Sequence, residues 1–315
     1  ILKYDAGGAE LWGKVLSGLV PVGSVENGLK PATATDSNGN FYVTGAFTGN
    51  YYFGNDTLVS AGEFDVFIFK YDATGAEVWG KRVGGTNNEF GVTITTDSNG
   101  NVYVIGFFTE SFSFASDNIF ITHGGIGYDA FDMVILKYDA AGGELWGKRL
   151  GINYGVGQNI TAGSMPSIST DSNGNLYMTG SANGPMTFGD EVLTNNTPKP
   201  SIFILKYDAA GNEVWGRRIV SDIIEYGSDT RSIATDSNGN VYAIGSFAGF
   251  MPFGSEILPL ISADQAPDIF VLKYTPIEPY TPIEPLTPAE PVTPAEPVTP
   301  ALICFPAGTP VLTDQ

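Results

Sequence analysis

The chain has 315 residues, and its 34 acidic against 15 basic residues give a formal net charge of −19. A surface this negative repels phosphate backbones and anionic membranes, so we expect no nucleic-acid partner. No stretch reaches the roughly 18 consecutive apolar residues of a membrane span. The single cysteine, Cys304, excludes an internal disulfide framework. The chain opens on Ile1 without a signal-peptide pattern, which favours a truncated start.

The first predicted elements are two strands, over 1–4 and 11–15, on either side of a turn that begins Lys3-Tyr4-Asp5. The Lys-Tyr-Asp sequence recurs three times, and a fifth copy at Lys273-Tyr274 lacks the Asp. Each complete copy is followed by Gly, an acidic residue and Trp-Gly, so the four tryptophans share one repeat position, 67, 67 and 69 residues apart. They are Trp12, Trp79, Trp146 and Trp215. This landmark predicts a hairpin turn in every unit.

A second landmark, Asp-Ser-Asn-Gly-Asn, lies between two short β-type runs in every unit. It occupies 36–40, 97–101, 171–175 and 236–240. Asn-Gly between such runs is the strongest short-range hairpin signal. Together with the Lys-Tyr-Asp turn, it gives each unit two hairpins and therefore four strands. The 40 glycines, 20 Phe and 15 Tyr suit many short strands joined by tight turns.

Between the two hairpins lies a connecting segment with a weaker signature. The signature is Phe-Gly at 53–54, 188–189 and 253–254, with Phe114-Ala115 as the divergent copy. An acidic residue then opens the third strand in three units, whereas Ser201 replaces it in the remaining one. The three acids are Asp65, Asp132 and Asp268.

A four-stranded antiparallel unit that repeats along the chain predicts an all-β fold, a β-propeller over residues 1–274 with four visible blades. Stacked blades bury both faces of their apolar strands, which a single blade cannot do. The ends are uneven, because the last unit, from Arg231 to Tyr274, stops at a third strand. Either the strand over 11–15 completes that unit across the closure, or further blades lie upstream in a larger ring.

From Thr275 to Pro300 the composition changes to a six-residue period of Thr-Pro-x-Glu-Pro-x. Two prolines in every six residues prevent helix and sheet and favour polyproline II. We therefore predict an extended linker over 275–300, a semi-rigid spacer that could reach on the order of 80 Å. Its four glutamates keep it solvated. It separates the propeller from a last segment over 301–315.

The pattern Asp-Ser-Asn-Gly-Asn-Val-Tyr-Val-x-Gly, followed by Phe-Gly, Lys-Tyr-Asp and Gly-x-Glu-x-Trp-Gly, resembles the bacterial seven-bladed-type β-propeller repeat family over residues 1 to about 274. The resemblance implies a secreted or surface-exposed module with a non-catalytic binding role. Its partner is then an unidentified protein or glycan. The blade number does not transfer, because only four first hairpins are present.

The run from Cys304 through Phe-Pro-Ala-Gly-Thr-Pro-Val-Leu-Thr resembles the opening motif of Hint domains, the self-processing fold of inteins and hedgehog-type proteins. The resemblance implies that Cys304 is a nucleophile that attacks the carbonyl of Ile303 and converts the peptide bond into a thioester. The family's Thr-x-x-His segment and its C-terminal His-Asn pair have no counterpart before Gln315. We therefore expect the segment to be inert here, and Cys304 to act only in an intact Hint domain.

The Asp-Ser-Asn-Gly-Asn turns have the alternating oxygen-bearing side chains of a calcium loop. A calcium site would draw on Asp36, Asn38, Asn40, Asp97, Asn99, Asn101, Asp171, Asn173, Asn175, Asp236, Asn238 and Asn240. The pattern lacks the downstream bidentate acid of a calcium loop, and the Asn-Gly turn alone explains every residue. We therefore expect no cofactor and keep calcium as the alternative.

The other candidates also have plain structural interpretations. The tryptophans could line a carbohydrate or peptide surface, although their place beside Gly on an outer strand favours blade packing. His123 is the only histidine, which excludes a multi-histidine metal site, and it lies in a predicted loop. Asp65, Asp132 and Asp268 could form a ring at one opening of the propeller, or could satisfy turn amides.

The sequence therefore predicts a non-catalytic scaffold or binding propeller of a secreted or surface protein, tethered by its linker to a Hint domain. No repeat copy stands out as a paired-carboxylate site, so we expect no enzyme activity in the propeller. Two alternatives stay open. One is the precursor of a self-processing protein with Cys304 as nucleophile, and the other is a calcium- or carbohydrate-binding propeller.

Overall fold

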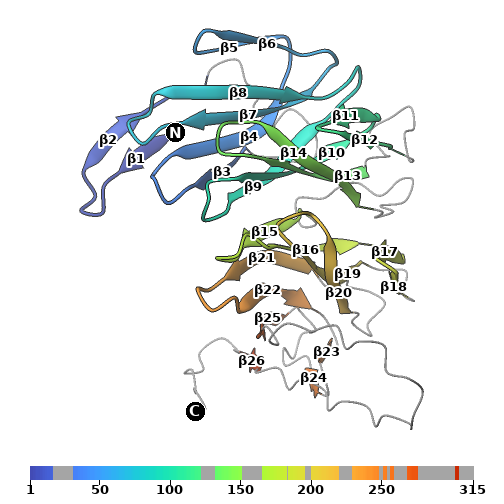
Figure 1. Cartoon of the computed structure of the whole chain (residues 1–315). Coiled ribbons are helices and arrows are strands. Elements are labelled where there is room, and N and C mark those ends of the chain that lie inside the picture. The colour runs from blue at the N-terminus through green and yellow to red at the C-terminus, as the bar shows by residue number, and fades with distance from the viewer. Residues whose placement is uncertain are drawn as a thin grey trace, which may run out of the picture.

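The computed structural model describes residues 1–16, 31–121, 132–150, 165–182, 184–195, 200–219, 229–247, 251–253, 256–258, 268–275 and 302–304. Every regular element within these residues is a strand (Figure 1). The predicted all-β fold is therefore confirmed. The predicted loop with His123, and all of the predicted linker after Thr275, lie outside the described residues.

Four sheets of four antiparallel strands follow one another along the chain, as the repeat predicts, and we call them blades A to D. Blade A comprises β3 (Ala32–Thr35), β4 (Phe41–Phe47), β7 (Asp65–Tyr71) and β8 (Glu77–Val83). Blade B comprises β9 (Phe90–Thr96), β10 (Val102–Phe108), β13 (Asp132–Tyr138) and β14 (Glu144–Leu150). Blade C comprises β15 (Ser167–Thr170), β16 (Leu176–Ala182), β19 (Ser201–Tyr207) and β20 (Glu213–Ile219). Blade D comprises β21 (Asp229–Thr235), β22 (Val241–Phe247), β25 (Asp268–Tyr274) and β26 (Leu302–Cys304).

The first hairpin of each blade closes on the Asp-Ser-Asn-Gly-Asn sequence. In blade A, the N–H of Asp36 donates to the carbonyl of Asn40 over 3.1 Å, and Gly39 takes a φ of +77° that favours glycine. The Oδ1 atom of Asp36 accepts the N–H groups of Asn38 and Asn40 at 2.9 and 3.0 Å. Asp72 makes the same backbone bonds in the second hairpin. Aspartate suits both turns because its short carboxylate reaches the backbone two and four residues on.

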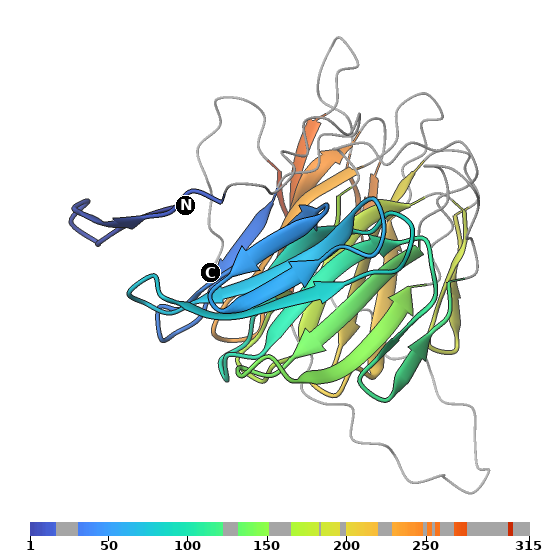
Figure 2. The same cartoon turned by 90° about the horizontal axis from the view of Figure 1, so that it is seen from above.

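The middle strands of the blades are buried on both faces. Every residue of β7, β10, β13 and β16 is buried. The cover comes from neighbouring blades, because β9 lies beside β3 on one side and beside β15 on the other, and β21 lies beside β15. Figure 2 shows these successive sheets stacked face to face. Strands such as β7 could not be buried by a single blade.

The strand predicted over 11–15 does not complete the last unit. It forms β2 (Glu10–Gly13), which pairs with β1 (Leu2–Tyr4) in a separate sheet of two strands. Blade D instead takes β26 as its fourth strand, where the backbone of Cys304 pairs with that of Phe270 in β25. The reason is that β1 and β25 both end in Leu-Lys-Tyr, so the N-terminal hairpin repeats a third strand that blade D already has.

The connecting segment of each blade forms a small two-stranded sheet of its own, which the Phe-Gly signature did not predict. These sheets are β5 (Asn50–Phe53) with β6 (Asp56–Val59), β11 (Phe112–Phe114) with β12 (Asp117–Ile119), β17 (Met186–Phe188) with β18 (Glu191–Leu193), and β23 (Met251–Phe253) with β24 (Glu256–Leu258).

Two residues of the Gly-x-Glu-x-Trp-Gly motif hold the small sheet in blade A. The Oε2 atom of Glu77 accepts the N–H of Gly54 at 2.8 Å. Gly80 leaves room for Phe53 and Leu58, because a Cβ atom at Gly80 would meet their side chains at 3.1 and 3.3 Å. The same carboxylate bonds join Glu144 to Ala115 and Glu213 to Gly189. The motif residues after the turn thus dock the connecting segment onto the outer strand.

The divergent copy of the Phe-Gly signature carries backbone strain. Ala115 has a φ of +54°, where the equivalent Gly54 and Gly189 have +58°. A side chain in this left-handed conformation costs roughly 1–2 kcal/mol, against which glycine loses about 0.5–1 kcal/mol of chain entropy. We predict that Ala115→Gly raises the free energy of unfolding by about 0.5–1 kcal/mol in urea denaturation.

Ala141→Gly is the matched control, because Ala141 lies in an exposed turn without a positive φ. Glycine there should lower the free energy of unfolding, since it only adds freedom to the unfolded chain. Equal losses at both positions would contradict strain at Ala115.

Candidate functional site

The Lys and Trp landmarks form the joint between neighbouring blades. In blade A, Trp79 Nε1 and Lys70 Nζ both donate to the carbonyl of Ala140, in the second-hairpin turn of blade B, over 3.3 and 2.7 Å. The same pair of bonds runs from Trp146 and Lys137 to Ala209, and from Trp12 and Lys3 to Ala73. One carbonyl of each turn is therefore bound by two side chains of the preceding sheet.

A glycine in the same turn lies against the indole ring. Gly142 has a φ of +86°, and a Cβ atom there would meet the ring of Trp79 at 3.0 Å. Gly75 faces Trp12 and Gly211 faces Trp146 in the same way. Trp79 and Trp146 are only 9% and 8% exposed. They serve blade packing, as their place on an outer strand predicted, and are too covered to line a recognition surface.

The joint from blade C to blade D differs from the others. Lys206 and Trp215 are present, but the next landmark continues Tyr274-Thr275 without the Asp and Gly that shape the turn. Among the described residues no carbonyl accepts a hydrogen bond from Trp215. Its ring still packs on Tyr274, with centroids 6.1 Å apart, as Trp79 packs on Tyr138, and Arg217 lies over it.

The joint between blades A and B yields a stability prediction. Gly142→Ala adds a side chain at positive φ and pushes it into Trp79, so we expect the free energy of unfolding to fall by about 2–4 kcal/mol. Gly184→Ala is the control, because Gly184 has a φ of +64° but nothing within 4 Å of the added carbon. It should lose only about 1 kcal/mol. Equal losses of unfolding free energy in chemical denaturation would contradict the close contact between Gly142 and Trp79.

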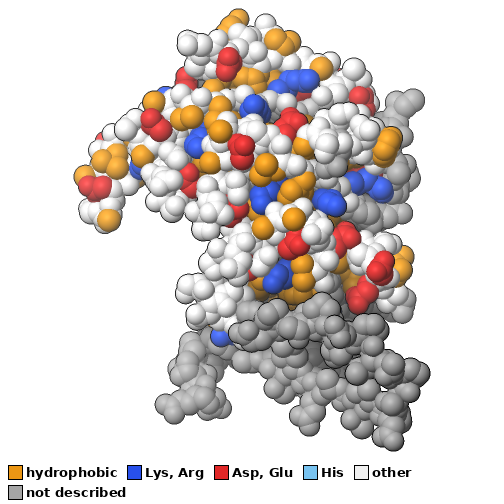
Figure 3. All heavy atoms as spheres, in the orientation of Figure 1, with side chains coloured by type: hydrophobic (Ala, Val, Ile, Leu, Met, Phe, Trp, Pro, Cys, Tyr) orange, Lys and Arg blue, Asp and Glu red, His pale blue; other side chains and the backbone are white. Residues whose placement is uncertain are grey.

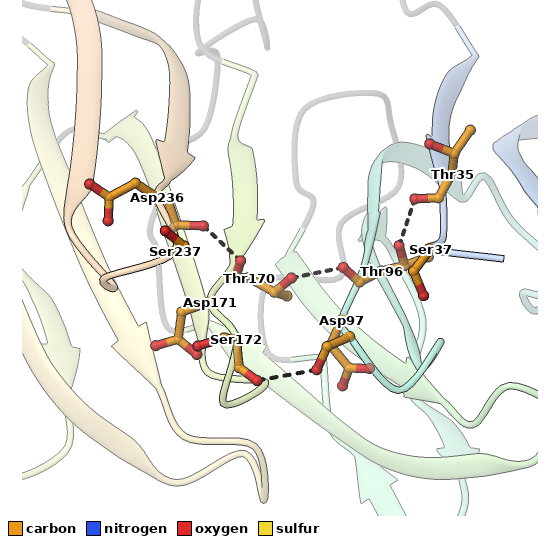
Figure 4. Close-up of a pocket in the computed structure, with 11 residues that line it drawn as sticks. Thr35, Ser37, Thr96, Asp97, Thr170, Asp171, Ser172, Asp236 and Ser237 are labelled. Atoms are coloured by element: carbon orange, nitrogen blue, oxygen red, sulfur yellow. Dashed lines mark hydrogen bonds between the residues drawn. The ribbon is translucent and has the colours of Figure 1, made fainter. Parts of the chain in front are cut away.

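A hollow lies where the innermost strands of the four blades end (Figure 4). Its volume is about 330 Å³, and only Thr, Ser and Asp residues line it. They are Thr35, Ser37, Thr96, Asp97, Ser98, Thr170, Asp171, Ser172, Thr235, Asp236 and Ser237. We call it the axial hollow. Blades B, C and D each contribute Thr, Asp and Ser from the start of the first turn, and blade A contributes Thr35 and Ser37.

A ladder of threonine hydroxyls fixes the walls of the axial hollow. Thr96 Oγ1 donates to the carbonyl of Thr35 over 2.9 Å, as Figure 4 shows. Thr170 Oγ1 donates to the carbonyl of Thr96, and Thr235 Oγ1 to that of Thr170, each over 2.7 Å. Sequence reasoning missed these residues. The available signal was that Thr precedes the Asp in all four copies of the turn.

The aspartates beside the axial hollow are bound within their own turns. Asp36 Oδ2 accepts the amide of Asn40 at 2.7 Å and the hydroxyl of Tyr42 at 3.0 Å. Burial raises the pKa of Asp36, but the hydrogen bonds from Asn40 and Tyr42 outweigh it and hold the pKa below its ordinary value. The Asn-to-carboxylate bond recurs at Asp97, Asp171 and Asp236.

This geometry bears on the predicted calcium sites. A cation at a turn would have to displace amide and hydroxyl donors from the carboxylate that should bind it. In the part of the chain that the structure describes, no three His, Cys, Asp or Glu side chains are grouped to hold a metal ion. These hydrogen bonds give the turns a structural role, and calcium at these residues stays a prediction.

The third-strand acids do not form an open ring in the blades where they are buried. Asp65 pairs with Arg82 at 2.6 Å and Asp132 with Arg149 at 2.9 Å, and both carboxylates are inaccessible to solvent. Asp65 also accepts the N–H of Ala61 at 2.8 Å, which is the turn-amide role. Of the predicted chemical site, the structure describes only the backbone of Cys304, at the end of β26.

Residues 78–106 match the family model of the SBBP Beta-propeller repeat, from β8 of blade A into β10 of blade B. An uncharacterized WD repeat-containing protein, L264 of Acanthamoeba polyphaga mimivirus, is 25% identical over 240 residues. The match covers 67% of this chain and 17% of that protein. Both matches support a β-propeller repeat family. The repeat match crosses the A–B joint and includes the first turn of blade B.

Among solved structures, a protein of unknown function from Bacteroides caccae is 11% identical, with a TM-score of 0.39. The alignment covers 82% of this chain and 66% of that one. Within the described residues, no helix is long and apolar enough to cross a membrane.

Proposed function

We propose that the β-propeller is a non-catalytic scaffold or binding module that takes a polar ligand, a glycan or a polar loop of a protein, in the axial hollow. The observation that supports this is the lining of the hollow, which consists of hydroxyl and carboxylate side chains from one repeated sequence. Such a lining offers many hydrogen bonds. The aspartates are held by their own turns, and Ser98 Oγ donates to the carbonyl of Ser172 over 3.1 Å. The hydroxyls of Ser37, Ser172 and Ser237 are therefore the groups with most freedom to meet a ligand.

The repetition argues against catalysis in the propeller. Acid–base and nucleophilic chemistry needs partners in unlike environments, whereas the hollow repeats Thr and Ser from every blade and Asp from blades B to D. The outer face carries no continuous field of one sign in the view of Figure 3, where Lys and Arg lie among Asp and Glu. That interspersion suits a module that recognises neutral groups.

A substitution that fills the axial hollow tests the proposal. The chain is first screened on an array of neutral oligosaccharides and serine-rich peptides. We predict that Ser172→Tyr weakens binding to the compounds it recognises by at least about tenfold. Thr187→Tyr is the control, because Thr187 is exposed on the small sheet β17–β18, away from the lining. Binding that survives Ser172→Tyr would contradict this site, and turnover of a hit that one propeller substitution abolishes would contradict the non-catalytic proposal.

The calcium alternative is examined in the same experiment with and without a chelator. Dependence of binding or of the melting temperature on calcium would support metal at the Asp-Ser-Asn-Gly-Asn turns. Asn99→Asp and Asn173→Asp would then tighten calcium, because a second carboxylate joins each loop. Indifference to calcium would leave the turns with a structural role alone.

We also propose that the propeller works outside the cell or on its surface, and that the segment from Cys304 opens a Hint domain in a longer protein. The support is the sequence motif after the proline-rich linker and the family resemblance of the repeats. The match covers 17% of the mimivirus relative, so the activity of that whole protein is not transferred to this chain.

The Hint proposal predicts a cleavage site. In a protein that continues into a complete Hint domain, added thiol should release a propeller fragment that ends at Ile303, through a thioester at Cys304. Cys304→Ala should abolish the release and separates thioester chemistry from proteolysis. Mass spectrometry that found an intact Ile303–Cys304 bond with or without thiol would overturn the proposal.

A further inference from the structure

The loop that leads from blade A to blade B carries a buried pair of carboxylates. The loop covers residues 84–89, between β8 and β9. Asp65, at the start of β7, and Glu89, just before β9, are both inaccessible to solvent. Neither residue belongs to the axial hollow. Two carboxylates withdrawn from water in one place are costly unless each charge is matched.

Only half of the Asp65 carboxylate is matched. Its Oδ2 atom accepts from Arg82 Nη1 at 2.6 Å and from the N–H of Ala61 at 2.8 Å. Its Oδ1 atom is buried and has no hydrogen-bond partner. A buried oxygen that accepts no hydrogen bond has lost its hydration without compensation. We therefore expect a proton or another donor at Asp65 Oδ1.

Glu89 is held from two sides. Its Oε2 atom accepts the N–H of Gly85 at 2.9 Å, and its Oε1 atom accepts the hydroxyl of Thr109 at 3.1 Å. Burial raises the pKa of Glu89, more than these two hydrogen bonds lower it, and the charge of Asp65 adds to the rise. An oxygen that accepts one N–H keeps room for a proton of its own.

The unmatched oxygen and Glu89 border the same point of the backbone. A side chain at Gly84 would collide with Asp65 Oδ1 and with Glu89 Oε2, the latter at 2.7 Å. Glycine at this position therefore leaves space that both carboxylates border.

The charged groups around the pair do not neutralise it. Within the described part of the chain, Arg82 is the cation that pairs with it, and it binds Asp65 Oδ2 and the carbonyl of Gly84. Glu110 lies on the far side of the loop, bound to the N–H and hydroxyl of Thr86. Glu63 accepts the amide of Asn88 at 3.1 Å. With all four acids ionised, one arginine would face four negative charges.

We propose that Asp65 and Glu89 share one proton, carried on Glu89 and donated to Asp65 Oδ1, and that this proton latches the loop between blades A and B. The shared proton supplies the donor that Oδ1 lacks and leaves one negative charge opposite Arg82. Two carboxylates that cannot both ionise at close range are a known arrangement of such pairs. At the equivalent positions of blades B and C, Arg149 binds Asp132 and Arg218 binds Ser201.

The shared proton holds the loop between blades A and B less firmly as the pH rises. A carboxyl group whose folded-state pKa lies above its unfolded value of about 4.3 adds its full stability below that value. The stability is lost as the pH climbs through the folded-state pKa. The proton then leaves to solvent, two buried charges face each other, and the loop moves away from β7. The joint is therefore closed at low pH and looser once Glu89 has lost its proton.

The test compares melting temperatures between about pH 4.5 and about pH 8 for the protein and its Glu89→Gln variant. Glutamine keeps the shape of Glu89 and does not titrate, although its amide nitrogen can donate to Asp65 Oδ1 only by giving up the bond from the N–H of Gly85. The unsubstituted protein should lose about 2–4 °C more than Glu89→Gln over this range. Glu110→Gln is the control, because it removes an acid of the same cluster outside the buried pair, and its pH profile should run parallel to that of the unsubstituted protein.

A second measurement follows the titration of Glu89 directly. In ¹³C NMR of protein labelled at glutamate carboxyls, one resonance should titrate at a higher pH than the others. This resonance should be absent in Glu89→Gln. Glu89 titrating together with the exposed glutamates would overturn the proposal, as would a full pH dependence retained in Glu89→Gln.

Discussion

The N-terminal hairpin, blade A and blade B are each tied to the next sheet by one carbonyl oxygen that receives two hydrogen bonds. The indole N–H and the ammonium group of one blade reach the same turn of its neighbour, and the ring covers the glycine of that turn. A charged donor adds to a neutral one, so each joint is worth roughly 1.5–3 kcal/mol beyond its packing. Middle strands such as β7 and β13 stay covered only while these joints hold the blades together.

Most residues of the repeat motif have a structural role. Asp36 closes a turn, Glu77 holds the small sheet β5–β6, and Gly80 makes room for its aromatic side chain. Trp79 joins the next blade. Chemistry specific to this protein must therefore use residues that the repeats do not share, and Glu89 is one of them.

The sequence predicted the parts of the fold that are encoded locally. Four strands per unit and both hairpin turns follow from Asn-Gly and Lys-Tyr-Asp, because each turn is built from residues a few positions apart. The position of Trp79 was evident, but its partner Ala140 lies 61 residues further on, in the next repeat, and periodicity alone cannot show which blade an outer side chain faces.

The less regular features escaped sequence reasoning for physical reasons. The small sheets have strands of three or four residues, too short for a period-two pattern. The addition of β26 to blade D brings together residues on either side of a long proline-rich segment. The pairing of Asp65 with Glu89 depends on a glycine between them, and the axial hollow on hydroxyls whose partners are carbonyls of another blade.

The two seams between blades run in opposite directions. At the inner seam a threonine hydroxyl of each blade reaches back to the blade before it, whereas at the outer seam Lys and Trp reach forward to the blade after it. Blade B therefore carries one donor set and one acceptor set at each face. Copying or deleting a whole repeat of this kind by recombination leaves all these bonds complete at the new junction, so the number of blades can change over evolution without any change in the motif.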